Sequence, residues 1–379
     1  MNRIILTAIA LTLAACGQAG DAKPAASAPA PGQPAASAAS GAPVKSESRT
    51  FRDWYAVCDN GNLCATYSGG STGWIRIGLD AGAAAQPTIH LGMWPEGEAL
   101  PGPLVVVIDG KRHATLPDPD DSGRATIPAD QVSSVVAALN AGKSLSLVAG
   151  TQTVEIPITG SSAALLWIDE RQGRLDTQAA LVRKGNKPAS SVFAAPALPL
   201  VVAAPAIDQA GFKTVKDPED PMGRDNATPP AALEALPAVK TCRADTAFNP
   251  YLQKVVTAAR LDANTELWGI PCDGGAYNFS YAYFLTAPGG ANARPVTFPM
   301  QDGGPARTAE GHSDLLVNPE YDPKTRTLSA FAKARGMGDC GVAQTWTWTG
   351  QTFVLSREQV MQDCWGMSSD FWPTTYRSR

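Results

Sequence analysis

The chain has 379 residues, of which 44% are hydrophobic and 17% are charged, and its formal net charge at pH 7 is −4. This composition is typical of a folded protein of about two domains, and the negative charge argues against nucleic acid and anionic surfaces as partners. No stretch after residue 16 is long and apolar enough to predict a transmembrane helix.

The first residues have the order of features found in a bacterial lipoprotein signal peptide. Arg3 supplies a positive charge, residues 4–13 are apolar but too few to span a bilayer, and LAAC at 13–16 resembles a lipobox. Cys16 would then become a lipidated N-terminus, held by about 0.8 kcal/mol per buried CH₂. Gly17, in place of Asp, favours the outer membrane. We therefore expect an outer membrane lipoprotein that faces the periplasm; an ordinary secretory peptide is the alternative.

Composition divides the chain after the signal peptide into four parts. Residues 17–46 are almost entirely Ala, Pro, Ser and Gly, which cannot offset the entropy of ordering, so they predict a disordered spacer. A Pro/Ala-rich region at 188–240 predicts a linker, whose apolar first part we expect to lie extended on a domain surface. The predicted fold class is α+β, with an α+β domain at 47–187 and a β-rich, disulfide-stapled domain at 241–379.

Hydrophobic periodicity predicts strands and two helices in the first domain. Apolar runs and alternation predict strands at 74–80, 104–109, 144–149 and 153–158. PADQVSSVVAALNAG predicts a helix after Pro128 that ends at Gly142. Its apolar face consists of Val132, Val135, Val136 and Leu139. A second helix is predicted to start near Ser162.

The second domain is richer in aromatic residues and in strand patterns. YNFSYAYFLT at 277–286 and TRTLSAFAKA at 325–334 predict strands, and NPYLQKVVTAAR at 249–260 predicts a helix. VAQTWTWTGQTFVLS, which begins after Gly341, predicts a β-hairpin that turns near Gly350.

RGMGDCG at 335–341 has the G-x-G-x-x-G spacing of a dinucleotide-binding loop. In such a loop the third glycine opens a helix whose N-terminus faces the phosphate. Here a strand is predicted instead, so we interpret Gly336, Gly338 and Gly341 as the tight backbone that enters the hairpin. We expect no nucleotide partner.

Six cysteines besides Cys16 predict disulfides, because an exported chain matures in an oxidising compartment. Six cysteines allow 15 connectivities. Their order favours nearest neighbours: Cys58 with Cys64, Cys242 with Cys272, and Cys340 with Cys364. The last bridge would contribute about 3 kcal/mol. A zinc site would need C-x-x-C pairs or His partners, so we expect neither a metal nor a cofactor.

Two further motifs resemble functional sites but have a simpler interpretation. GGSTG around Ser71 matches a nucleophile elbow, which needs a helix after it, whereas a strand is predicted there. DPDDSG at 118–123 resembles the start of an EF-hand loop, but its twelfth position is Ala129 instead of Glu. We expect two turns; weak calcium binding at the second is the alternative.

The histidines and the acids of WIDERQGR form no catalytic constellation in the sequence. The three histidines, His90, His113 and His312, do not have the spacing of metal ligands. Asp169 and Glu170 are adjacent, so they should point to different faces of a helix, and we expect surface pairing with Arg171 or Arg174.

Trp346 and Trp348 lie two positions apart in a predicted strand, so they share one face. Such a pair is typical of a sugar-stacking platform, which in a periplasmic protein would bind peptidoglycan. A core face filled by large rings is the favoured alternative.

Several motifs, in order, resemble a family of bacterial envelope proteins catalogued as domain of unknown function 1176. The motifs are FRDWYAVCDNGNLCAT, AALLWIDERQGR, RGMGDCG, WTWTGQTFVLS and CWGMSSDFWPTTYR, and the match runs from Phe51 to Arg379. FRDW, the nearby cysteine pair and LVVVIDG also make the first domain distantly similar to invasion-associated locus B proteins. The family resemblance implies an exported protein of Gram-negative bacteria, without catalytic residues to carry over.

These observations favour a non-catalytic lipoprotein that is tethered to the membrane by its lipid and binds an envelope protein or peptidoglycan. A lysozyme-type inhibitor is one alternative. A peptidoglycan-acting enzyme that uses scattered acids is another.

Overall fold

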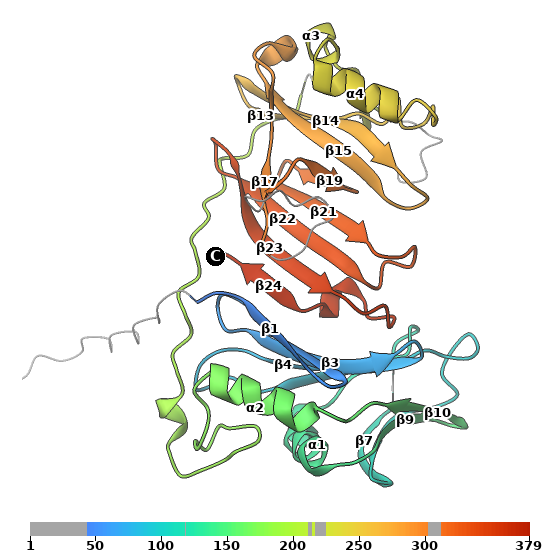
Figure 1. Ribbon diagram of the computed structural model, residues 1–379, viewed down its shortest axis with the longest axis vertical. Coiled ribbons are helices and arrows are strands. Elements are labelled where there is room, and N and C mark those ends of the chain that lie inside the picture. The colour runs from blue at the N-terminus through green and yellow to red at the C-terminus, as the bar shows by residue number, and fades with distance from the viewer. Residues whose placement is uncertain (1–43, 118, 211–213, 217–224, 302–311) are drawn as a thin grey trace, which may run out of the picture. The chain divides into compact units, whose positions relative to one another are not determined.

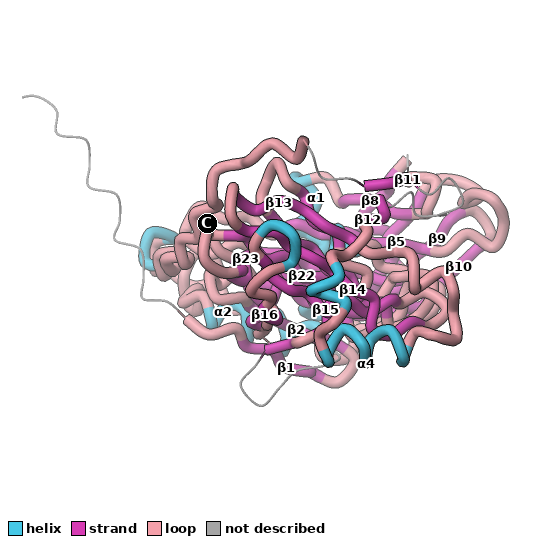
Figure 2. The backbone as a smooth tube through the Cα atoms, turned by 90° about the horizontal axis from the view of Figure 1, so that it is seen from above, coloured by secondary structure: helices cyan, strands magenta, loops and turns pink. Residues whose placement is uncertain are grey.

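The computed structural model describes residues 44–117, 119–210, 214–216, 225–301 and 312–379 (Figure 1). The predicted lipidation residue Cys16 and most of the predicted spacer lie outside these ranges. The described residues form one unit by their contacts, so the predicted two-domain division stays a prediction. Few helices and many strands are present, in agreement with the α+β prediction (Figure 2). No described helix combines the length and the hydropathy needed to span a membrane.

An antiparallel sheet forms the beginning of the described chain. Its order is β1 (Glu47–Phe51), β2 (Trp54–Cys58), β3 (Cys64–Gly70), β4 (Gly73–Leu79), β5 (Thr88–Met93) and β8 (Arg124–Thr126). Cys58 and Cys64 lie directly opposite each other in the β2–β3 register. A disulfide can therefore close this hairpin without moving the backbone.

A second antiparallel sheet covers the core of this region. Its order is β10 (Gln152–Ile156), β9 (Leu145–Ala149), β6 (Leu104–Ile108) and β7 (Lys111–Leu116). Residues in β6, β9 and β10 alternate between buried and more exposed positions, because one face of each strand packs against the core. These strands confirm the predictions made from the apolar runs.

Two helices pack on the same core (Figure 1). α1 (Ala129–Ala141) buries the predicted face of Val132, Val135, Val136 and Leu139. It ends at Gly142, where a Cβ would approach the Ile108 side chain to 2.7 Å, so glycine permits this close packing. α2 (Ser161–Arg171) begins one residue before its predicted start.

The region predicted as a linker contains both extended chain and short elements. After η1 (Ala189–Ser191), the segment around residues 194–208 has no regular secondary structure and runs along the C-terminal strands (Figure 1). The Val201 N–H donates to the Arg379 carbonyl, and the Ala204 N–H donates to the Trp348 carbonyl, each at 2.9 Å. The prediction of an extended apolar segment on a protein surface is confirmed. The remaining elements are β11 (Thr214–Lys216), β12 (Asp225–Ala227), α3 (Ala231–Glu234) and α4 (Pro237–Asp245).

The predicted helix at 249–260 is wrong. Strand β13 (Thr257–Asp262) occupies its end, and the helix of this region, α4, lies earlier in the chain. The β-branched run of Val255, Val256 and Thr257 favours an extended backbone, and β14 supplies the pairing partner. Tertiary pairing therefore decides a sequence that also fits helical periodicity.

The C-terminal region consists of antiparallel strands. One sheet contains β13, β14 (Thr265–Gly274), β15 (Phe279–Thr286) and β16 (Arg294–Pro295), and β19 (Leu315–Val317) also pairs with β15. Another contains β20 (Glu320–Asp322), β21 (Thr327–Lys333), β22 (Gly341–Trp348), β23 (Phe353–Met361) and β24 (Thr374–Arg377). The pair β17 (Phe298–Pro299) and β18 (His312–Ser313) and the short helices η2 (Pro288–Gly290) and η3 (Ser369–Phe371) complete the described elements.

Candidate functional site

A hollow of about 220 Å³ lies between helix α1 and two loops, residues 83–87 and 178–189. Its apolar lining includes Val136 of α1, which is buried. Its polar lining consists of exposed side chains: Gln86, Ser133, Gln178 and Lys184. The lining offers amides, a hydroxyl and an ammonium group around an aliphatic floor, a combination suited to recognition by hydrogen bonds and charge.

Arg174 binds the second loop and the residues that directly precede the first. Its Nη2 donates to the carbonyls of Asp80 and Gly82, at 3.2 and 2.8 Å, and its Nη1 donates to the Ala179 carbonyl at 3.4 Å. The residue is 1% exposed, and burial lowers the pKa of its guanidinium, while the charge of Asp169 opposes this shift. One buried side chain thus connects Ala179, which lines the hollow, to the chain segment that leads into the first loop.

Asp169 fixes the second loop. Its two carboxylate oxygens accept the backbone N–H groups of Leu181 and Val182, both at 2.8 Å, and its side chain is completely buried. Burial raises the pKa of Asp169, and the two N–H donors and the charge of Arg174 act against that rise. The carboxylate therefore positions the loop segment that lines the hollow.

The predicted surface pairing of Asp169 is wrong. Asp169 faces the protein interior, whereas its neighbour Glu170 is exposed. Arg171 instead pairs with Glu47 of β1 at 2.9 Å. A charged run at the end of a helix predicts a solvent-exposed face. Here the loop at 178–189 packs against Asp169, and two of its backbone N–H groups donate to the carboxylate.

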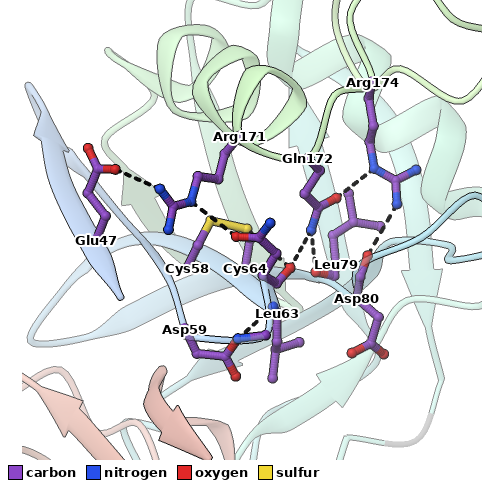
Figure 3. Close-up of a disulfide and its surroundings, with 12 residues drawn as sticks. Glu47, Cys58, Asp59, Leu63, Cys64, Leu79, Asp80, Arg171, Gln172 and Arg174 are labelled. Carbon is purple, nitrogen blue, oxygen red and sulfur yellow. Dashed lines mark hydrogen bonds and ion pairs between the residues drawn. A yellow bond between two sulfur atoms is a disulfide. The ribbon is translucent and has the colours of Figure 1, made fainter. Parts of the chain in front are cut away.

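Gln172 connects the end of α2 to the first sheet, as Figure 3 shows. Its Nε2 donates to the carbonyls of Asn62 and Leu79, at 2.8 and 3.1 Å, and its Oε1 accepts from Arg174 Nε at 2.6 Å. Asn62 lies in the short loop closed by the Cys58–Cys64 disulfide. The loops around the hollow are consequently joined to a covalently closed hairpin.

The three disulfides join the pairs that cysteine order predicts: Cys58–Cys64, Cys242–Cys272 and Cys340–Cys364. Asp339 lies beside the third pair, with ligand atoms of the three residues within 4.8 Å of one another. The two sulfurs are bonded to each other, so they are not thiolate ligands.

The glycine loop at 335–341 leads into a strand, as predicted. Gly341 has φ = 137° and begins β22, and a Cβ there would meet the Ala332 carbonyl oxygen at 2.0 Å. Arg335 pairs with the Asp339 carboxylate, which also accepts the Gly366 N–H at 2.6 Å. A nucleotide loop would need a helix after Gly341, and the β22–β23 hairpin occupies that position.

Trp346 and Trp348 do not form a stacking platform. Their exposed fractions are 0% and 1%, and both rings pack against Phe298 or Phe353 with centroids 5.2 Å apart. Trp346 Nε1 donates to the Pro299 carbonyl at 2.7 Å. The shared face of this strand points into the core, so no ring surface is available to a sugar.

The other sequence motifs have ordinary surroundings. Ser71 lies in the turn between β3 and β4, without the helix that a nucleophile elbow needs. Asp120 accepts the N–H groups of Ser122 and Arg124, so its carboxylate organises a turn. His90 contacts the Thr126 hydroxyl at 2.9 Å.

The structure does not bring the predicted site residues together. His113 lies on β7, and the side chain of His312 and all of Asp118 lie outside the described structure. The sequence reasoning missed Gln172 and Arg174 as organisers of the hollow. The available signal was their place directly after an apolar helix, where orphan carbonyl groups and neighbouring loops need donors.

Comparison with known proteins gives a family. The model described as "Protein of unknown function (DUF1176)" matches residues 48–379. The chain belongs to this family. It is 29% identical over 352 residues to the uncharacterized protein YpfG of Escherichia coli (strain K12), an alignment that covers 87% of this chain and 93% of the relative. No solved structure matches the chain significantly. These comparisons do not show the predicted similarity of the first domain to invasion-associated locus B proteins.

Proposed function

We propose that this family member is a non-catalytic binding protein of the cell envelope, which holds its ligand in the hollow beside α1. The observation that carries the proposal is the buried pair behind the hollow, Asp169 and Arg174, at 0% and 1% exposure. Burying two charges costs several kcal/mol per ion before their attraction is counted. Hydrogen bonds help to offset this cost: Asp169 accepts the Leu181 N–H, and Arg174 donates to Gln172 and to the Ala179 carbonyl. Ala179 and Leu181 line the hollow.

The chemistry of the described groups supports binding over catalysis. The six cysteines of the described chain are paired as disulfides, which removes thiolate nucleophiles. The carboxylates of Asp59, Asp169 and Asp339 each accept backbone N–H groups. Among the residues that line the hollow, none is an acid or a histidine, so the lining itself lacks a general base.

The proposal includes an anchor on Cys16 and a periplasmic location at the outer membrane. The apolar segment and LAAC motif support lipidation, and the spacer at 17–46 would place the folded body away from the bilayer. A flexible chain of this length has an end-to-end distance of about 30 Å. The hollow would then reach ligands in the periplasm without leaving the membrane.

Site-specific photo-cross-linking in living cells tests the binding proposal. Ala137 lines the hollow on the exposed side of α1, and Ser134 is exposed on the same helix but does not line it. A photoreactive residue at position 137 of the full chain should capture a distinct envelope component, identified by mass spectrometry. Position 134 is the matched control. Absence of a product specific to position 137 would contradict the proposal.

Metabolic labelling tests the anchor. Radioactive palmitate should enter the wild-type chain and fail to enter the Cys16→Ala variant, which should leave the membrane fraction. An unlabelled wild-type chain, or equal labelling of both chains, would show that Cys16 carries no lipid.

A further inference from the structure

The hollow has a positive charge at its rim, and its lining contains no negative one. Lys184 is the charged residue of the lining, and the other polar groups are the neutral side chains of Gln86, Ser133 and Gln178. We propose that the hollow binds a short aliphatic chain that ends in a carboxylate, in particular the C-terminus of a peptide with small side chains. The inference rests on the proposed binding function and specifies its ligand.

Charge complementarity supports a carboxylate. The nearby Asp176 pairs with Arg183 at 2.9 Å and with Lys187 at 3.8 Å, so its charge is already opposed by two cations. None of the ion pairs found in the described chain includes Lys184. Lys184 lies on the loop that Asp169 holds through Leu181 and Val182, so its backbone is positioned before a ligand arrives.

The size of the hollow limits the ligand. Its volume is about 220 Å³. Pockets for drug-sized ligands begin at about 300 Å³. One or two small residues fit this space, whereas a folded partner or a long saccharide would engage only its rim.

The lining favours an aliphatic peptide over a sugar. Its apolar part consists of alanines with Pro87, Val136 and Leu181, and no aromatic side chain belongs to it. Sugar rings are commonly bound against aromatic faces, which this lining does not offer. Small aliphatic side chains suit the alanine-rich floor because they fill it without overpacking.

The two glutamine side chains suit peptide groups. Each amide offers both a donor and an acceptor, which is the combination that a peptide unit presents in return. Three backbone donors of the second loop are used elsewhere: the Ala180 N–H donates to the Thr177 carbonyl, and the Leu181 and Val182 N–H groups donate to Asp169. The side-chain amides of Gln86 and Gln178 belong to the lining, so each loop contributes one amide to the hollow.

Three probes separate the parts of the inference: N-acetyl-alanyl-alanine, its C-terminal amide, and butyrate. Binding to the full mature chain in detergent is followed by NMR shifts and titration. The acid should bind with shifts centred on the hollow. The amide should bind about fivefold more weakly, since one exposed charge pair contributes up to about 1 kcal/mol. Butyrate should bind more weakly than the acid, because it lacks peptide groups.

Two pairs of variants locate the site. Lys184→Gln should weaken binding of the acid about fivefold and leave binding of the amide unchanged, and exposed Lys143 supplies the control Lys143→Gln. Ser133→Leu should fill the hollow and abolish binding of both, whereas Ser134→Leu, one position away on α1, should not. Near-UV circular dichroism checks that each variant is folded.

The outcomes separate this inference from the binding proposal. Equal affinity for acid and amide would overturn the carboxylate and leave a binding site in place. Stronger binding of butyrate than of the acid would overturn the peptide. Failure of all three probes, together with a product cross-linked to position 137, would overturn the ligand class and support binding of another ligand. Failure of both experiments would overturn the hollow as a site.

Discussion

Arg377 in the last strand donates its Nε hydrogen to the carboxylate of Asp59, 318 positions earlier in the chain, with a separation of 2.5 Å. Asp59 is completely buried and also accepts the N–H groups of Gly61 and Leu63. The Arg377 backbone pairs with the Asn60 side chain in both directions, each at 2.9 Å. Strand β24 therefore supplies hydrogen bonds to the loop that the Cys58–Cys64 disulfide closes.

Arg377→Gln should lower the free energy of unfolding by about 1.5–3 kcal/mol, because it removes a charged hydrogen bond from a buried carboxylate. The deficit should be larger at pH 7 than at pH 4. Burial raises the pKa of Asp59, with Arg377 acting against the rise, so stability falls as the pH rises from the unfolded pKa of about 3.9 to the folded pKa. Without Arg377 the folded pKa is higher still, so this loss is larger in the variant. Urea unfolding at both pH values measures this. Arg379 is exposed, so Arg379→Gln is the control. An equal loss of unfolding free energy in that variant would contradict the stabilising role of the Arg377–Asp59 pair.

Asp169→Asn should release the second loop of the hollow. The variant removes the charged acceptor of the Leu181 and Val182 N–H groups, and a hydrogen bond to a buried charged group contributes about 1.5–3 kcal/mol. Amide hydrogen exchange at Leu181 and Val182 should accelerate most. Glu170→Gln, one position away and exposed, should change neither stability nor exchange. Unchanged protection in Asp169→Asn would mean that the carboxylate does not hold the loop.

Replacing both Cys340 and Cys364 by alanine should lower stability by about 3 kcal/mol, because the bridge closes a long loop across 24 positions. The Cys58–Cys64 bridge spans six positions, so the corresponding double variant should lose about 2 kcal/mol. Chemical denaturation of both variants compares them. A larger loss for the shorter loop would show that native contacts, and not chain entropy, dominate.

The glycine loop should resist mild acid. Burial alone would raise the pKa of Asp339, but the hydrogen bonds from Arg335 and from the Gly366 N–H outweigh it and hold the pKa below its usual value. Its stabilising contribution is present above the unfolded pKa of about 3.9 and is lost as the pH falls through the lower folded pKa. Hydrogen exchange at Gly366 should thus stay slow at pH 5 and accelerate, relative to intrinsic rates, only below about pH 4. In Asp339→Asn this step should vanish; loosening of the wild-type loop at pH 5–6 would contradict the assignment.

Local periodicity in the sequence was enough to predict several elements. The apolar face of α1 follows from Val132, Val135, Val136 and Leu139, because each helix turn returns a side chain to one side. The β22–β23 hairpin follows from alternation around Gly350, and cysteine order agrees with the three disulfides. These features depend on residues close in sequence, so their signal is local.

Only the tertiary structure decided where the candidate site lies, whether Trp346 and Trp348 are exposed, and whether Asp169 is buried. Trp346 and Trp348 share a face in any strand, but the core that covers this face comes from residues such as Phe298 and Phe353. Asp169 and Arg174 read as surface charges until the loops at 80–82 and 179–182 supply their partners. Burial and long-range pairing depend on which distant segments meet, and the periodicity of a single segment does not contain that information.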